Sequence, residues 1–330
     1  MITPPTTVAP LQVSLVPIQA APAINTLAQI RCSGSLDPAA PWVTLPLTLV
    51  DTPPMDELWT VDDVVEKTDH GPIHTRRSQH HSFSWLWIKL SEHDGMAAAS
   101  EWAYRLLLEH LQQSSHPHLL KIWHYLPAIN QGDDDCENYR RFCRGREQAL
   151  RQSERSAGPL PAATAIGIPQ ADARYALFYW LSCAAPGINI ENPRQTHAWR
   201  YPRRYGPSSP NFSRGTLSEF SRQFFISGTA SVVGHDTAHP HDSSAQTREM
   251  LNNLQTLLDT ARQRCAQLPD LSHLDGPLRL YLRHPHEWPQ LRQICVANGL
   301  PLERLIVCHG DICRDDLTIE LDGIQTLRSA

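Results

Sequence analysis

Lysine is scarce in this 330-residue chain. Only Lys67, Lys89 and Lys121 are lysines, whereas 26 residues are arginine. These 29 cations stand against 34 Asp and Glu residues, which gives a formal net charge of −5. The chain therefore lacks the basic surplus of a general nucleic-acid or anionic-membrane binder. The arginine excess has two open explanations: nucleotide bias in the coding sequence, or a use for planar guanidinium groups, which bind carboxylates as two-donor forks.

Cysteines and long apolar runs are also few. Eight cysteines are too sparse for a disulfide scaffold, and neither Cys136 with Cys143 nor Cys308 with Cys313 has a second pair at zinc-ligand spacing, so reduced thiols are expected. No run reaches the ~18 apolar residues of a membrane span. Residues 1–5 lack the basic and apolar segments of a signal peptide. We expect a cytoplasmic protein that binds neither membrane nor nucleic acid.

What the chain does contain is a repeated pattern of predicted elements. It is 41% hydrophobic, enough for a packed core. Residues 1–80 are proline-rich at the front and predict short strands and coil. Beyond them, apolar periodicity predicts the order strand, helix, strand, helix, strand, strand twice. The first copy has strands at 81–90, 119–126, 164–168 and 175–183 and helices at 95–113 and 133–152; the second has strands at 224–233, 278–282, 305–308 and 317–324 and helices at 247–268 and 288–298.

A duplicated unit is the simplest explanation of this order. It predicts an α+β fold of two tandem units, with mixed β-sheets and helices packed on one face. We divide the chain into an N-terminal unit with its proline-rich extension (1–183), a joining segment rich in arginine and proline (184–215) and a C-terminal catalytic unit (216–330).

The joining segment concentrates positive charge. Residues 193–215 hold five arginines and two tyrosines but no carboxylate, and prolines stiffen the segment. A stiff cluster of unpaired cations is suited to binding an anion, because little ordering cost is left for the binding step. The alternative is a solvated linker with scattered charge. The five arginines are Arg194, Arg200, Arg203, Arg204 and Arg214.

Glu320 is the candidate acid. Alternation along 317–322 puts three apolar residues on one face of the predicted strand and Thr318, Glu320 and Asp322 on the other. If that second face lines a cleft, desolvation raises the pKa of the carboxyl, as a general acid near neutral pH requires. The alternative is a solvent-facing strand residue. The corresponding strand of the first unit, at 175–180, has no carboxylate, so only one unit would keep the acid.

Two further patterns suggest chemistry but fit it poorly. His235, His239 and His241 are metal-ligand types at plausible spacing, yet Pro240 limits how they converge. We therefore predict a polar surface loop and no metal, and keep metal-dependent hydrolysis as an alternative. Residues 227–231 (SGTAS) lack the GxSxG pattern of a hydrolase nucleophile. Their small side chains favour close approach of a ligand to the backbone.

Four segments together resemble the chorismatase family. They are YRRFCRGR at 139–146, YPRRYGPSSPNFSR at 201–214, FISGTASVVGH at 225–235 and VCHGDICRDDLTIE at 307–320, and the resemblance spans roughly residues 80–325. It implies tandem units of the RidA/YjgF-like, or chorismate-mutase-like, fold. It also implies a cofactor-independent enzyme that cleaves the enolpyruvyl ether of the small molecule chorismate and releases pyruvate. A fused repeat supplies contacts that a trimer makes between subunits, so a monomer is favoured.

The resemblance implies a role for each of four residues. Arg146, Tyr205 and Arg214 would bind the two carboxylates of chorismate. Glu320, matching the catalytic glutamate of the family, would protonate the enol methylene carbon. The cationic centre that forms would be stabilised by the neighbouring carboxylate and dipoles.

Small pocket residues would decide the product. Cys313, as a second catalytic residue, and Gly228 and Ala230, as substrate-binding residues, occupy the corresponding positions. The cysteine resembles members that form 3-hydroxybenzoate, with 4-hydroxybenzoate as a second product. The alternatives are a chorismate hydrolase, which gives a dihydroxycyclohexadiene carboxylate, and a non-catalytic RidA-like protein that binds small molecules.

Overall fold

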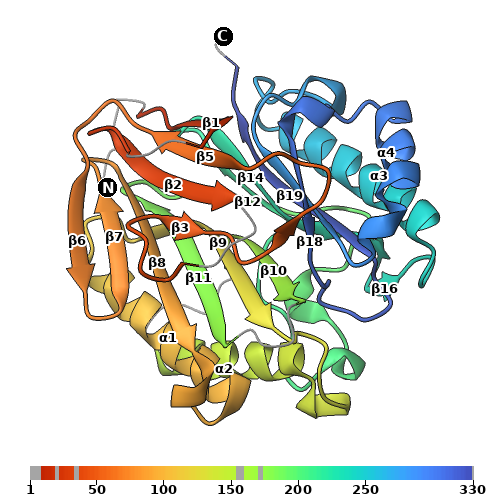
Figure 1. The fold of residues 1–330 in the computed structure, drawn as a ribbon, viewed down its shortest axis with the longest axis horizontal. Coiled ribbons are helices and arrows are strands. Elements are labelled where there is room, and N and C mark those ends of the chain that lie inside the picture. The colour runs from red at the N-terminus through yellow and green to blue at the C-terminus, as the bar shows by residue number, and fades with distance from the viewer. Residues whose placement is uncertain (1–8, 19–21, 33–36, 154–159, 170–173, 329–330) are drawn as a thin grey trace.

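Two β-sheets with the same internal strand order form the body of the structure. The computed structural model describes residues 9–18, 22–32, 37–153, 160–169 and 174–328, so the expectation for residues 1–5 lies outside it (Figure 1). The first unit consists of β8 (His81–Lys89), α1 (Gly95–Gln113), β9 (His118–Pro127), α2 (Asn138–Gln152), β10 (Ala162–Ile168) and β11 (Tyr175–Cys183). The second consists of β14 (Gln223–Ala230), α3 (Ser243–Arg262), β17 (Leu278–Leu282), α4 (Trp288–Ala297), β18 (Leu305–His309) and β19 (Ile319–Thr326).

The topology of the two units is identical. The strands lie in the order β10-β9-β11-β8 in the first and β18-β17-β19-β14 in the second. In each unit, the second strand pairs in parallel with the third, and the last strand runs antiparallel between the second and the first. The predicted α+β fold with a duplicated unit is therefore confirmed.

The first 80 residues contribute more than short strands and coil. They form a separate four-stranded sheet in the order β1-β5-β2-β3 and also extend both repeat sheets. Its strands are β1 (Gln12–Pro17), β2 (Thr26–Cys32), β3 (Val43–Thr44) and β5 (Met55–Thr60); β6 (Glu66–His70) and β7 (Ile73–Arg77) extend the first repeat sheet, and β4 (Thr48–Leu49), with β12 (Ile188–Ile190) and β13 (Gly215–Ser218), extends the second. The division at residues 183 and 215 stays a prediction.

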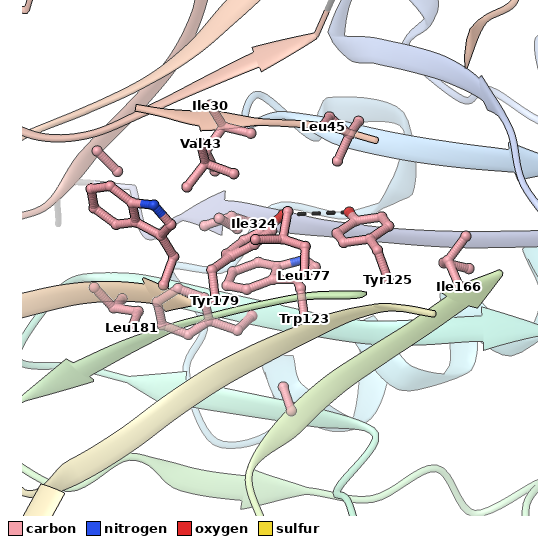
Figure 2. Close-up of a cluster of buried hydrophobic side chains, with 14 of the residues drawn as sticks. Ile30, Val43, Leu45, Trp123, Tyr125, Ile166, Leu177, Tyr179, Leu181 and Ile324 are labelled. Atoms are coloured by element: carbon pink, nitrogen blue, oxygen red, sulfur yellow. Dashed lines mark hydrogen bonds between the residues drawn. The ribbon is translucent and has the colours of Figure 1, made fainter. Parts of the chain in front are cut away.

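Each sheet has one face toward helices and one toward the centre of the molecule. Helices α1 and α2 lie against the first repeat sheet, and α3 and α4 lie against the second (Figure 1). The buried side chains of each helix pair share a hydrophobic cluster with those of its sheet. The opposite faces meet the four-stranded sheet in one central cluster. Figure 2 shows Ile30 and Val43 of the N-terminal sheet above Trp123 and Tyr179 of the first unit, with Ile324 of the second. Burying this apolar surface joins the three sheets into one core.

Several predicted boundaries were wrong. The last strand, predicted at 317–324, is β19 at Ile319–Thr326. The acidic run expected to begin the second helix forms a separate 3-10 turn, Asp134–Cys136, and α2 starts only at Asn138. The third helix begins at Ser243 rather than 247, because Asp242 caps it by accepting a hydrogen bond from the Ala245 N–H at 2.9 Å. It ends at Arg262 rather than at 268.

The predicted strand at 224–233 is broken. A register shift between Ile226 and Thr229 distorts β14, which ends at Ala230, and Val232–Val233 forms a short hairpin (β15) with Asp236–Thr237 (β16). No helix within the described part of the chain is long and apolar enough to cross a membrane.

Candidate active site

A cavity of about 350 Å³ lies where the two units meet. Its wall includes β10 residues of the first unit and residues of β14 and β19 of the second. Cavities of roughly 300–1,000 Å³ are typical of small-molecule sites. All seven residues proposed from the sequence line it: Arg146, Tyr205, Arg214, Gly228, Ala230, Cys313 and Glu320.

Glu320 is held rigidly in the middle of a sheet. On β19 it lies opposite Ala230 of β14 on one side and Tyr281 of β17 on the other, and it is only 4% exposed. Burial raises the pKa of its carboxyl to about 8, and the neighbouring Asp322 adds to this rise. Among the residues that the structure describes, none forms a hydrogen bond with this carboxyl. Glu320 is thus a protonated acid at neutral pH, and the solvent-facing alternative is excluded.

Gly228 gives Glu320 its room. A Cβ at this position would collide with Oε1 of Glu320 and would lie 2.8 Å from its Cδ. The glycine lies within the irregular part of β14, where the register shifts between Ile226 and Thr229. A glycine in a strand commonly marks such a close approach. Gly228 therefore contacts the acid as well as lining the cavity.

Arg146 brings a buried cation to the cavity. It projects from α2, is 3% exposed and lies over the Phe142 ring at 4.9 Å. One guanidinium nitrogen is 3.4 Å from Sγ of Cys143. Within the described ranges, it forms no ion pair with a carboxylate. A buried guanidinium without a carboxylate is costly unless a ligand supplies one.

Arg214 is a second cation of this kind. It is 5% exposed, and its Nη2 donates to the Thr196 carbonyl at 3.0 Å and to the Tyr201 hydroxyl at 2.8 Å. Its Nε is buried and has no hydrogen-bond partner. No carboxylate in the described chain forms an ion pair with it. This free donor suits a bound anion.

Arg314, which the sequence analysis did not single out, also lines the cavity. Its guanidinium stacks over the Tyr205 ring at 4.1 Å and donates to Oγ1 of Thr237 at 3.2 Å. The Tyr205 hydroxyl donates to Oδ1 of Asp236 at 2.9 Å, so this side chain already has an acceptor. The only sequence signal for Arg314 was its place beside Cys313 in a family-like segment.

The expectation that the arginines of the joining segment lack carboxylate partners was wrong for three of the five. The fold brings carboxylates from other elements to Arg194, Arg203 and Arg204. These partners are Glu249, Asp135 and Asp236. Of the five, only Arg204 and Arg214 line the cavity. The predicted anion-binding role can therefore apply only to these two arginines of the segment.

Cys313 forms part of the wall as a neutral thiol. Burial, with a further contribution from Glu320, raises the pKa of this thiol well above its usual range. A neutral thiol is a poor nucleophile. Its loop is fixed by Arg283, which ion-pairs with Asp311 at 2.8 Å and donates to the Arg314 carbonyl at 2.9 Å.

His124, another wall residue that the sequence analysis missed, is also neutral. Its Nδ1 lies 2.8 Å from the Thr164 carbonyl, so Nδ1 carries the hydrogen, and Nε2 accepts from the Tyr104 hydroxyl at 2.8 Å. Burial lowers the pKa of the imidazole to about 3. His124 is therefore a neutral polar residue of the cavity wall whose ring is held by two hydrogen bonds, and it is not a proton donor at neutral pH.

The histidine loop lies beside the cavity. Arg204 donates to Nδ1 of His235 at 3.0 Å, and Nε2 of His239 is 3.9 Å from Glu249. Across the described ranges, no three metal-ligand side chains lie together.

A buried protonated acid beside guanidiniums that form no ion pair, between two copies of one α+β unit, is the arrangement expected of an enzyme site for an anionic small molecule. The family model for chorismatase FkbO/Hyg5-like, N-terminal, matches residues 57–182. A 3-hydroxybenzoate synthase of Streptomyces hygroscopicus is 30% identical over 88% of this chain and 87% of its own. A chorismatase of Streptomyces rapamycinicus is 30% identical over 81% of each chain. A crystal structure of a chorismatase matches 97% of this chain and 99% of its own, with 28% identity and a TM-score of 0.84. The chain belongs to the chorismatase family, as its sequence predicted.

Proposed function

We propose that this enzyme cleaves the enolpyruvyl ether of chorismate to pyruvate and 3-hydroxybenzoate, with 4-hydroxybenzoate as a second product. The observation that carries the proposal is the buried, protonated Glu320 in a cavity that also holds guanidiniums without carboxylate partners. The similarity to a relative named 3-hydroxybenzoate synthase supports the product.

The cations account for substrate binding. Chorismate carries two carboxylates, and Arg146, Arg214 and Arg314 offer three guanidiniums at the cavity wall. Hydrogen bonds between charged groups contribute about 1.5–3 kcal/mol each. The ring of Tyr205 completes this wall and holds Arg314 by stacking. A protein of negative net charge thereby binds a dianion through local charge.

Glu320 supplies the proton. Transfer of its proton to the terminal methylene carbon turns the enol ether into an oxygen-stabilised cation and leaves Glu320 as a carboxylate. That new negative charge faces the positive centre and stabilises it. In the hydroxybenzoate route, attack from within the substrate on the ring carbon breaks the bond from that carbon to the ether oxygen, and the bonding electrons stay on the oxygen as pyruvate leaves. The ring system then loses one proton, which the Glu320 carboxylate takes back, and becomes aromatic. Because pyruvate and a hydroxybenzoate together contain all the atoms of chorismate, this outcome consumes no water.

The small residues around Glu320 determine whether the protonated substrate is attacked from within or by water. Attack from within the substrate leads to a hydroxybenzoate, whereas attack by water gives the dihydrodiol. Cys313, Gly228 and Ala230 line the cavity around the acid, and a neutral thiol at 313 acts by its size. We assign them to product selection.

The test is incubation of the purified protein with chorismate. Pyruvate is followed by the oxidation of NADH with lactate dehydrogenase, and the aromatic product is identified by chromatography. The expected result is equimolar pyruvate and hydroxybenzoate, mainly the 3-isomer. Absence of pyruvate would refute the proposed function and favour a binding protein. A dihydrodiol would refute the product, and loss of activity with a chelator would indicate a metal.

We also propose that the enzyme is a monomer in the cytoplasm. The four-stranded N-terminal sheet already covers the inner faces of both repeat sheets, which share one buried cluster with it. All eight cysteines are free, as in a reducing compartment. Light scattering of the protein as it elutes from a size-exclusion column should give the mass of one chain, 37.1 kDa; the mass of a dimer or trimer would contradict this.

A further inference from the structure

A buried ion pair lies behind the acid, between the two units. Asp322 of β19 is 1% exposed and accepts four hydrogen bonds. The donors are Lys121 Nζ at 3.2 Å, Trp123 Nε1 at 2.7 Å, Thr164 Oγ1 at 2.6 Å and the Tyr281 hydroxyl at 3.2 Å. Three of these donors come from the first unit and one from the second.

The four donors suit a carboxylate and not a carboxylic acid. An ionised carboxylate is an acceptor only, and here both of its oxygens receive hydrogens. Lys121 is fully buried, and its Nζ also donates to the Ile226 carbonyl. A buried carboxylate paired with a buried ammonium and further hydrogen bonds is the arrangement in which both charges are tolerated.

Asp322 shares a face of β19 with Glu320. Residues two apart in a strand project to the same side, roughly 6.6 Å apart along it. Both side chains are buried, so little water screens one from the other. A fixed negative charge at this distance disfavours a second one on Glu320. The ammonium of Lys121 lowers the pKa of Glu320, by less than Asp322 raises it. Burial lowers the pKa of Lys121 itself to about 8, so this opposing charge is present below that pH.

After burial, the largest effects on the pKa of Glu320 come from Asp322, Lys121 and Arg214, and of these three only Asp322 raises it. Arg214 favours the ionised form, and the thiol of Cys313 and the hydroxyl of Tyr139 are neutral because burial raises their pKa. The remaining ionisable side chains of the cavity wall are His124, Glu137, Arg140, Arg146, Arg204, Tyr201, Tyr205, Arg314, Asp315 and Asp316.

We propose that Asp322, held ionised by Lys121, is a positioning residue that keeps Glu320 protonated for catalysis. The proposal rests on the proposed function, because it assigns Glu320 the role of proton donor. Only the second unit has this arrangement of two carboxyl groups on one strand face, since the corresponding β11 has no carboxylate. The first unit contributes instead the lysine that pairs with Asp322.

The test is the pH dependence of kcat/KM in Asp322→Asn, which removes the charge but keeps the shape. A general acid is active below its pKa, so the wild-type rate falls as the pH rises through about 8. In the variant, the fall of kcat/KM at high pH, the alkaline limb of the profile, moves to lower pH by about one to two units. A shift of one unit costs about fivefold at pH 8 and almost nothing at pH 5.5. A loss of rate that is equal at every pH would overturn the proposal.

A second variant tests the proposal if Asp322→Asn does not fold. Asp322→Asn leaves Lys121 unpaired, whereas the double variant Lys121→Met with Asp322→Asn removes both buried charges. In the double variant, the limb is expected between those of the wild type and the single variant, because the cation that opposed Asp322 is also gone. Asp56→Asn is the matched control, a buried, ion-paired aspartate of the N-terminal sheet, and it should leave the limb in place. An unshifted double variant would overturn the proposal if the single variant does not fold.

A direct titration separates this inference from the proposed function. The ¹³C-labelled side-chain carboxyl of Glu320, assigned by its loss in Glu320→Gln, is followed by NMR against pH without substrate. We expect a lower pKa in Asp322→Asn than in the wild type. If the wild type does not cleave chorismate, the proposed function is refuted, but the titration still shows whether Asp322 raises the pKa of Glu320. If wild type is active and the pKa of Glu320 does not move, the inference alone fails.

Discussion

Replacement of Arg214 by methionine tests how the cavity binds its anion. Methionine keeps much of the apolar volume but removes the guanidinium, including the buried Nε that has no partner within the protein. Truncating one member of a buried, hydrogen-bonded charge pair typically costs about 2–5 kcal/mol. That range corresponds to a weakening of chorismate binding by about 30-fold to several thousand-fold.

The assay is the KM for chorismate in the coupled pyruvate reaction. We expect KM to rise by at least about 30-fold while kcat changes much less, because the contact is made to substrate and transition state alike. Arg194→Met is the matched control, since this arginine lies in the same segment but is paired with Glu249 away from the cavity wall. A KM for Arg214→Met no different from that of Arg194→Met would refute the reasoning.

Three further predictions concern the acid and its wall. Gly228→Ala should displace the Glu320 carboxyl and lower kcat, by up to about a hundredfold for a 1 Å shift, with little change in Tm; an unchanged kcat would contradict this. Cys313→Ala should keep pyruvate release but change the ratio of aromatic products by chromatography, whereas complete loss of activity would mean that the thiol reacts. The pKa of Glu320 is raised from 4.5 to about 8 in the folded state, so its stabilising contribution is present below pH 4.5 and is lost as the pH rises through 8. Thermal unfolding of Glu320→Gln should lack this component of the pH dependence; curves that stay parallel to wild type would disprove the shift.

Local patterns in the sequence were enough to predict the repeated unit and the strand face on which Glu320 lies. Alternation and helical spacing are short-range signals, and they placed α1 and β11 at the residues where the structure has them. The same alternation put Glu320 and Asp322 on one face of β19. Alternation could not show whether that face is exposed to solvent. Its burial depends on the first unit and on the N-terminal four-stranded sheet, which is more than 250 residues away in the chain.

The remaining features depend on contacts between distant segments. Asp322 was visible only as a strand residue, since its partner Lys121 is on β9 of the other unit. Arg203 and Arg204 looked unpaired because their carboxylates come from elsewhere in the fold. A short stretch of sequence shows charge but not which charges the fold brings together.

The central claim is that Glu320 donates the proton that starts chorismate cleavage. The decisive measurement is pyruvate release from chorismate by Glu320→Gln at pH 7, with circular dichroism and chorismate binding measured on the same preparation. Loss of a positioned general acid costs about 10²–10⁴-fold in rate. We predict a loss of this size, with the fold and binding retained. Pyruvate release at the wild-type rate would contradict the account.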